Sequence, residues 1–298
     1  MSGKLKEVRD RIKTVQSIQQ TTKAMKMVSA AELRRAQDAI QQMRPYALKL
    51  QEMLGNIIAS GGSETEMELA DPRPVEKVLL VVITSDRGLC GGYNSNLIKL
   101  ARLRIREKYP TQFAAGSGTI MAIGKKGFEY FTKSGFRVDG SFRSLFSDLR
   151  FEEVRVAAQQ VVEGYLKKDY DVVELIYSEF KNAIVQQFRA ETFLPVQKSV
   201  PRTEEARGGI RADFIYEPDQ TAILRELLPK ILNTQFYKAT LDAHASEHGA
   251  RMTAMDKATE NANDFLKDLR ITYNRVRQAA ITTELTEIVG GAAALTGR

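Results

Sequence analysis

The sequence predicts an α/β protein in which a long N-terminal helix and a long C-terminal helix form an antiparallel coiled coil beside a central Rossmann-like α/β domain. At both ends of the chain, apolar residues recur in alternating steps of three and four, which is the period of a coiled-coil seam. Between these ends, short apolar runs alternate with helical segments, an order typical of βαβ units and a mainly parallel sheet. We therefore divide the chain into an N-terminal helix (1–58), a linker (59–76), a central domain (77–213) and a C-terminal helix (214–298).

The N-terminal segment reads as one helix. Between Lys4 and Ile58 it holds a single proline, Pro45, and no glycine before Gly55. Because proline removes a helical hydrogen bond, we expect Pro45 to kink or interrupt the helix. The predicted seam consists of three runs of residues spaced three or four apart: Leu5, Val8, Ile12 and Val15; then Thr22 and Met25; then Leu33, Ala36, Ile40, Met43, Ala47, Leu50, Leu54 and Ile57.

The central segment follows a polar stretch rich in Gly and Pro, "SGGSETEMELADPRP" (60–74). The run 184–194 begins too few residues after the preceding strand for a crossover helix, so we expect it to pair antiparallel at an edge of the sheet. We expect helices at 93–109, 125–133 and 151–168. We expect strands at 78–83, 119–123, 136–142, 172–177 and 184–194.

A second flexible stretch, "SVPRTEEARGGIRAD" (199–213), precedes a helix that we expect from about Asp219 to the end. At 1.5 Å per residue the two long helices extend about 80 Å and about 120 Å. Aligning their ends near the domain places Lys4 level with approximately residue 272. About 25 apolar-rich C-terminal residues then have no partner within the chain, and a lone helix of that kind is unstable in water. We expect other subunits to form a socket for it.

Composition narrows the class of protein. The sequence contains no run of 18 apolar residues, which a transmembrane helix would need. The charged N-terminus does not resemble a secretory signal, and a single cysteine indicates a reducing compartment. Residues 1–58 hold eleven Lys/Arg against five Asp/Glu, close to the whole net charge of +7. Such a segment suits nucleic acid, an anionic membrane or an acidic protein, or is a solvated helix face. Because Tyr46 is the one aromatic residue of this segment, we do not expect it to bind nucleic acid by stacking on bases.

The stretch "ITSDRGLCGGYNSN" (83–96) joins a strand to a helix, where phosphate-binding loops occur. Its glycines do not form G-x-G-x-x-G, and "MAIGKKG" (121–127) lacks the first glycine and the Ser/Thr of a Walker loop. Close packing of helix on strand is the alternative. Cys90 could act as a nucleophile at this helix N-terminus, but a histidine base occurs only on the C-terminal helix.

The C-terminal helix contains "HASEH" (244–248), which fits the H-x-x-E-H pattern of a zinc hydrolase. His244 and His248 share one helical face, with Glu247 as the base. Zinc needs a third protein ligand from elsewhere. The alternative is a pair of polar residues on a solvated helix.

Four further motifs carry a resemblance along nearly the whole chain. "TTKAMKMVSAAELRRAQ" (21–37), "TSDRGLCGGYN" (84–94), "FIYEPD" (214–219) and "RQAAITTELTEIVGGAAAL" (277–295) resemble, in the same order, the signatures of the gamma subunit of F-type ATP synthases. The single cysteine excludes the dithiol insertion of the thiol-regulated chloroplast type, and no transit peptide is recognisable. Both features favour a bacterial member of the family.

The resemblance implies a rotor shaft without catalytic residues, cofactor or metal, which couples ion-driven rotation of the c-ring to ATP synthesis or hydrolysis. Its implied partners are three alpha and three beta subunits, the epsilon subunit and the c-ring, with no nucleic acid, at the cytoplasmic face of the bacterial plasma membrane as a peripheral component. Alternatives are a non-catalytic coiled-coil scaffold and, less favoured, the zinc enzyme. The implied beta-subunit contacts are Lys23, Met25, Lys26, Met27, Arg277, Gln278 and Thr282. The implied bearing tip is Ile288, Val289, Ala292, Ala293 and Leu295, and the implied foot against the c-ring and epsilon is Phe214, Tyr216 and Glu217.

Overall fold

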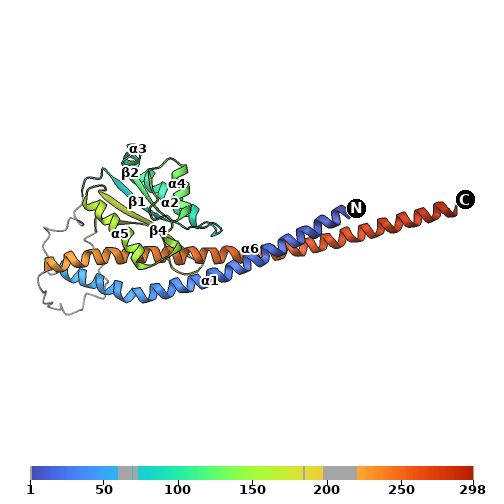
Figure 1. Ribbon diagram of the computed structural model, residues 1–298, viewed down its shortest axis with the longest axis horizontal. Helices are drawn as coiled ribbons and strands as arrows, with labels where there is room; N and C mark the ends of the chain where they lie inside the picture. Colours follow the sequence, from blue (N-terminus) through green and yellow to red (C-terminus); the bar gives the residue numbers. More distant parts are fainter. Residues whose placement is uncertain (1, 60–68, 70–72, 184, 197–219, 298) are drawn as a thin grey trace. The chain divides into compact units, whose positions relative to one another are not determined.

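A computed structural model describes residues 2–59, 69, 73–183, 185–196 and 220–297 (Figure 1). Two long helices, α1 (Ser2–Ala59) and α6 (Gln220–Thr296), take up the two ends of the chain. The chain separates into two compact units: one combines residues 1–29 with 251–298, and the other comprises residues 30–250. Each unit is described by itself.

The larger unit contains a five-stranded sheet in the order β3-β2-β1-β4-β5. The first four strands are parallel to their neighbours, whereas β5 pairs antiparallel with β4 at the edge, as predicted. The strands are β1 (Val78–Ile83), β2 (Gly118–Ile123), β3 (Val138–Asp139), β4 (Val172–Phe180) and β5 (Gln186–Leu194). The shorter helices are α2 (Tyr93–Lys108), α3 (Pro110–Ala114), α4 (Lys125–Lys133) and α5 (Phe151–Leu166).

Three expectations about the elements are corrected. The strand expected at 136–142 has only two residues, Val138–Asp139, because it pairs with β2 at just two positions. The helix expected at 93–109 ends at Lys108, and the short α3 follows from Pro110. Of the two effects expected at Pro45, a kink or an interruption, the interruption does not occur, since α1 continues through this residue; α6 likewise contains Pro229. The low helix propensity of proline predicts a break at such positions, but each of the two helices continues through its proline.

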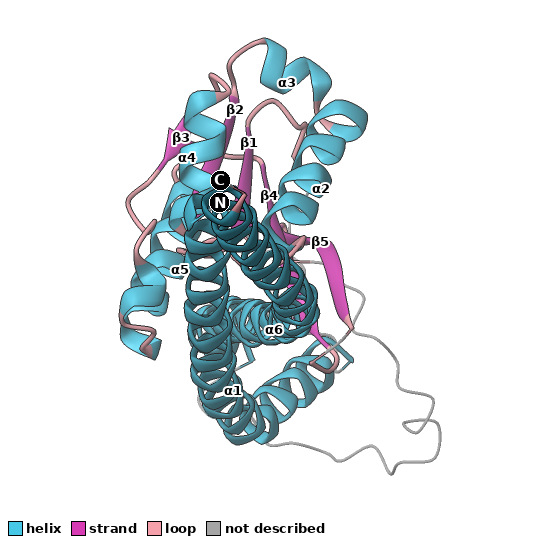
Figure 2. Ribbon diagram, turned by 90° about the vertical axis from the view of Figure 1, so that its right-hand side faces the viewer, coloured by secondary structure: helices cyan, strands magenta, loops and turns pink. Residues whose placement is uncertain are grey.

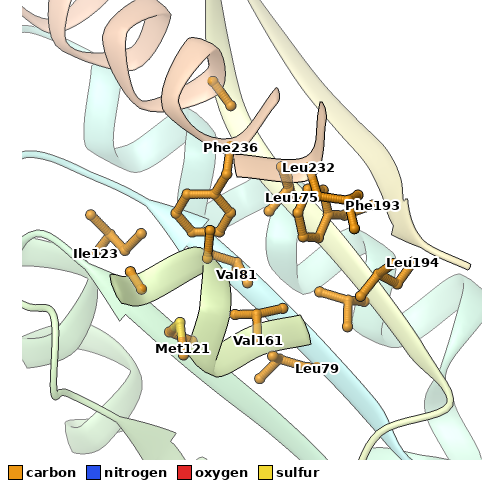
Figure 3. Packing of buried hydrophobic residues seen from close by; sticks show 14 of the residues in the cluster. Leu79, Val81, Met121, Ile123, Val161, Leu175, Phe193, Leu194, Leu232 and Phe236 are labelled. Carbon is orange, nitrogen blue, oxygen red and sulfur yellow. The ribbon is translucent and has the colours of Figure 1, made fainter. Parts of the chain in front are cut away.

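Alternate residues of β1 belong to the two hydrophobic cores, one on each face of the sheet. Leu79, Val81 and Ile83 pack with α5 and with the residues of α6 up to Ala243, where Phe236 is fully buried (Figure 3). Val78, Leu80 and Val82 pack with α2 and α4 instead. Helices α2 and α5 accordingly lie on opposite sides of the sheet (Figure 2). Burial on both faces explains why β1 is an uninterrupted apolar run.

A buried carboxyl group, Asp242 of α6, lies beside the edge of this sheet. Asp242 is 5% exposed, and burial raises the pKa of its carboxyl group to about 7. Lys238 and Lys181 oppose this rise, while Glu179 and Glu191 add to it. The folded chain therefore keeps the proton up to about pH 7, whereas an unfolded chain releases it near pH 4. The unfolding free energy contributed by this group falls as the pH rises through that window.

We expect Asp242→Asn to stabilise the protein more at pH 8 than at pH 5, with a difference of about 2 kcal/mol, because the amide stays neutral where the carboxyl must ionise. Urea unfolding of the full chain at the two pH values measures this. The control is Asp268→Asn at an exposed position of the same helix, which should show no such difference. An effect of Asp242→Asn that is equal at both pH values would contradict the prediction.

Candidate functional site

The smaller unit consists of the first part of α1 packed against the last part of α6. Four side-chain pairs join the helices and show that they are antiparallel. In every pair the two residue numbers add to 281 or 282. The pairs are Arg9 Nη2 to Tyr273 OH at 3.2 Å, Thr22 Oγ1 to Thr259 Oγ1 at 2.8 Å, Gln19 with Asn263, and Lys26 with Asp256.

This register corrects the sequence-based alignment. It places Lys4 level with residue 278, not 272, because contacts between side chains and not the helix ends determine the alignment. Residues 281–296 of α6 consequently lie beyond the described part of α1. The stretch without a helical neighbour is thus about 15 residues long instead of about 25.

That terminal stretch of α6 carries an exposed apolar stripe. Ile281 is 48% exposed, Leu285 57%, Ile288 67% and Val289 66%. Their spacing of four, three and one places them on one face of the helix. A continuous exposed apolar face of this kind is typical of surfaces that contact another molecule. Of the predicted tip, Ala292 is exposed too, whereas the side chains of Ala293 and Leu295 lie outside the described residues.

The predicted beta-subunit contacts occupy two separate levels of this unit. Lys23 is exposed, Met27 is 62% exposed, Met25 is half-buried, and Lys26 pairs with Asp256. On α6, Arg277, Gln278 and Thr282 are all exposed, and the Thr282 hydroxyl donates to the Gln278 carbonyl at 2.9 Å. In the observed register residue 278 lies beside residue 4, about 20 residues or about 30 Å from Met25 along the helix. The two sets are therefore not brought together.

The sequence-based list missed four exposed apolar residues in the same unit. Ile18 is 49% exposed and Val28 62%, both on α1, and Phe265 is 54% and Ile271 67% exposed, both on α6. Val28, Phe265 and Ile271 lie outside the predicted seam, whereas Ile18 follows its period, three residues after Val15. Apolar residues at positions that the predicted seam leaves out are the sequence signal that could have identified all four. The predicted foot residues Phe214, Tyr216 and Glu217 lie outside the described residues.

The strand–turn–helix motif of the larger unit makes its contacts within the chain. The backbone N–H of Ser85 donates to Asn94 Oδ1 at 3.0 Å, and Asn94 Nδ2 donates to Ser85 Oγ at 2.7 Å. Cys90 is 2% exposed in the core beneath α2, and Tyr93 OH donates to the Ala243 carbonyl at 2.9 Å. These bonds support the packing interpretation of the turn.

The Walker-like segment also has its donors in use. At the start of α4, the N–H groups of Lys125, Lys126 and Gly127 donate to Asp86 Oδ1 at 3.2 Å, the Ser85 carbonyl at 3.1 Å and Thr84 Oγ1 at 2.9 Å. A phosphate loop needs such groups to be available to its ligand. Here the preceding turn caps the helix from within the chain.

The H-x-x-E-H residues do not assemble a zinc centre in the described part of the chain. His244 stacks on Phe146 with ring centroids 5.6 Å apart, and the His244 and His248 rings meet edge to face at 4.6 Å. Glu247 is 6% exposed. Among the residues that the structure describes, no three His, Cys, Asp or Glu side chains are grouped to hold a metal. The geometry gives no support to the zinc-enzyme alternative.

Comparison with known proteins decides the family. The sequence model of the ATP synthase family matches residues 4–295. The ATP synthase gamma chain of Cytophaga hutchinsonii is 51% identical, over 98% of this chain and 98% of its own length. The chain belongs to the ATP synthase gamma chain family. The gamma chain of Flavobacterium johnsoniae is 49% identical over 98% of this chain and 99% of its own length.

A solved structure has the same fold. In the Euglena gracilis mitochondrial ATP synthase, one chain matches with a TM-score of 0.65 and 21% identity, covering 99% of this chain and 95% of that one. Gamma chains are non-catalytic, and catalysis belongs to the beta subunits. The chain is accordingly a rotor shaft subunit of a membrane-associated ATP synthase. Within the described residues, no helix is long and apolar enough to span a membrane.

Proposed function

We propose that this gamma chain couples rotation to ATP synthesis through two levels of contact with a ring of three alpha and three beta subunits. The N-terminal level is Lys23, Met25, Lys26 and Met27, and the C-terminal level is Arg277, Gln278 and Thr282. The apolar tip beyond them, Ile288, Val289, Ala292, Ala293 and Leu295, turns in an apolar sleeve. Phe214, Tyr216 and Glu217 meet the epsilon subunit and the c-ring, at the cytoplasmic face of the bacterial plasma membrane.

One observation carries this proposal: the exposed apolar stripe of residues 281–289 lies on a helix end with no described α1 neighbour. Water-exposed apolar side chains in this number gain free energy when a partner covers them. A ring of other subunits supplies such a partner. Because apolar contacts are non-directional, the helix end can turn inside the ring without breaking contacts of fixed geometry.

Charge supports the N-terminal contact level. Residues 1–29 hold seven Lys/Arg and two Asp/Glu, an excess of five positive charges. Met27 and Val28, each 62% exposed, add an apolar patch beside Lys23. A partner that combines acidic side chains with apolar ones is complementary to this surface.

The coupling follows from the shape of the shaft. Three chemically identical beta subunits have identical affinities for nucleotide unless something distinguishes them. A single pair of helices presents different side chains in different directions, so it makes unequal contacts with the three subunits. Contact free energies that differ among their conformations shift the conformational population of each subunit. Turning the shaft by one third of a revolution exchanges these states.

Deletion of residues 288–298 tests the tip. We expect the deleted chain to enter the complex with about fivefold lower yield when limiting alpha and beta subunits are shared with the intact chain, since about 1 kcal/mol of apolar contact is lost. Native mass spectrometry measures the ratio and should show one gamma chain per three alpha and three beta subunits.

The control removes only Gly297 and Arg298, which follow the end of α6 at Thr296. It should compete as well as the intact chain. Equal yields for the longer deletion and the control would contradict the tip assignment, and a stoichiometry other than one would contradict the proposed shaft role.

A further inference from the structure

Helix α2 carries an excess of positive charge on a side of the sheet that the proposed function does not use. Its 16 residues include one acid, Glu107, and five basic side chains. The basic residues are Lys99, Arg102, Arg104, Arg106 and Lys108. The face of the helix on which each basic residue lies determines whether it pairs with a buried carboxylate or lines a cleft.

Two of the five serve the interior. Glu174 of β4 is 1% exposed, and Lys108 Nζ contacts its Oε1 at 2.5 Å. Arg104 Nε lies 3.8 Å from the other carboxylate oxygen, and Tyr109 OH donates to Oε1 at 2.7 Å. A buried carboxylate needs such partners to offset the loss of hydration. Arg104 and Lys108, which are one helical turn apart, therefore stabilise the buried carboxylate of Glu174.

The other three line a cleft of about 530 Å³. Lys99, Arg102 and Arg106 follow one another at steps of three and four, so they form a stripe along one helix face. Leu103, which is 37% exposed, Ile105 and Phe136 form the apolar part of the lining. The cleft thus combines three cations with an apolar floor, and none of its described lining residues is acidic. Glu107 lies at its margin, where its Oε1 is 3.8 Å from Arg106 Nη2.

The floor is held in place by packing. The Phe136 ring lies 6.0 Å from Phe113 and 5.8 Å from Phe131, centroid to centroid, in edge-to-face geometry. Arg102 Nη1 donates to Tyr130 OH at 3.1 Å, which orients its guanidinium. The site is therefore preformed to a large degree, which lowers the entropic cost of binding.

The spacing of the cations determines the class of ligand. From Lys99 to Arg106 the stripe extends about 10 Å along the helix axis. A compact phosphate is bound by converging donors, usually at a helix N-terminus, but none of the six lining residues lies in the first turn of a helix. Acidic side chains at positions i, i+4 and i+7 of a helix repeat over the same distance. Apolar residues between them would meet the floor.

We propose that this cleft is a docking site for an acidic amphipathic helix of another protein. Carboxylates of the helix pair with Lys99, Arg102 and Arg106, and an apolar side chain enters between Leu103 and Phe136. This is helix-in-groove recognition, with charge complementarity selecting the partner and the apolar contact supplying affinity.

The test uses the assembled ATPase complex containing the full chain, and its probe is a fluorescent peptide of about 14 residues with Glu at i, i+4 and i+7 and Leu between them. We expect saturable binding that weakens with added salt. Lys99→Ala, Arg102→Ala and Arg106→Ala together should weaken it at least tenfold. The control removes the same charge elsewhere on this unit, through Lys125→Ala, Lys133→Ala and Lys167→Ala, and should change binding less than twofold.

The apolar contact has its own matched pair. Leu103→Asp should weaken binding about tenfold, whereas Leu166→Asp, at a similarly exposed position of α5 (40%), should not. ATP hydrolysis by each complex verifies assembly separately, so loss of peptide binding with normal hydrolysis does not bear on the shaft function.

Several outcomes would overturn the docking site. These are no saturable binding to the complex, equal binding of a scrambled peptide, equal losses in the two triple variants, and displacement of the peptide by inorganic phosphate or by anionic lipid vesicles at equivalent charge concentration. The last two outcomes would assign the cleft to a simple anion or to a membrane surface.

Discussion

Replacing Met25 by lysine is expected to lower ATP-driven ion pumping by the assembled complex about tenfold while ATP hydrolysis stays within about twofold. Met25 is half-buried on α1, two residues from the exposed Met27 and beside Lys23 and Lys26. A further ammonium group at this level adds an attraction of about 1–4 kcal/mol to acidic groups of a beta subunit. Because the three beta subunits are chemically identical, an added attraction of that size holds the shaft equally at each third of a turn and opposes its passage to the next, so hydrolysis and rotation become poorly coupled.

The measurement compares ion pumping into inverted vesicles, followed with a membrane-potential dye, with the rate of ATP hydrolysis in the same vesicles. Met25→Gln is the matched control, since it keeps a similar length without the charge and should pump normally. Normal pumping by the lysine variant would remove Met25 from the contact surface. An equal loss in both variants would indicate that packing of the half-buried side chain matters instead of charge.

The second large effect is expected for Gly124→Ala, which should lower the unfolding free energy by roughly 3 kcal/mol or more. Gly124 precedes α4 with φ of 95°, a conformation that residues with a Cβ rarely adopt. A Cβ at this position would lie 2.2 Å from the Thr84 carbonyl oxygen. Strained φ and a collision with backbone therefore act together, and Thr84, which is fully buried and directly follows β1, has no room to move away.

Urea unfolding of the full chain measures this loss, and Gly135→Ala separates the two causes. Gly135 also has a positive φ, 79°, but a Cβ there would meet nothing within 4 Å. We expect it to cost only about 1 kcal/mol, from backbone strain alone. Equal losses at the two glycines would show that the contact with Thr84 relaxes without cost.

Much of the fold could be predicted from local pattern. The bounds of β1 (Val78–Ile83) and α4 (Lys125–Lys133) agree with the sequence-based prediction, and β5 is the antiparallel edge strand. These elements have strong periodicity or a short preceding connection. The strand β3 was predicted too long because its apolar residues belong largely to a loop, where Phe136 packs on the core beneath α4.

The candidate site was predictable in part. The exposed tip residues Ile288 and Val289 follow from an apolar helix end with nothing to cover it. Exposed apolar residues such as Val28 and Phe265 belong neither to the seam nor to the positions that the resemblance assigns to subunit contacts, so neither signal identifies them. The residue-level contacts with other subunits stay predictions.

The sequence by itself determined the order of the main helices and strands, the coiled-coil period at both ends and the resemblance to the family, because these depend on local spacing and on motifs that can be read along one chain. Only the tertiary structure decided the helix register, the capping of α4 by Asp86 and Thr84, and the burial that raises the pKa of Asp242. The physical reason is that these three features join groups far apart in sequence. Their distances and surroundings exist only once the chain has folded.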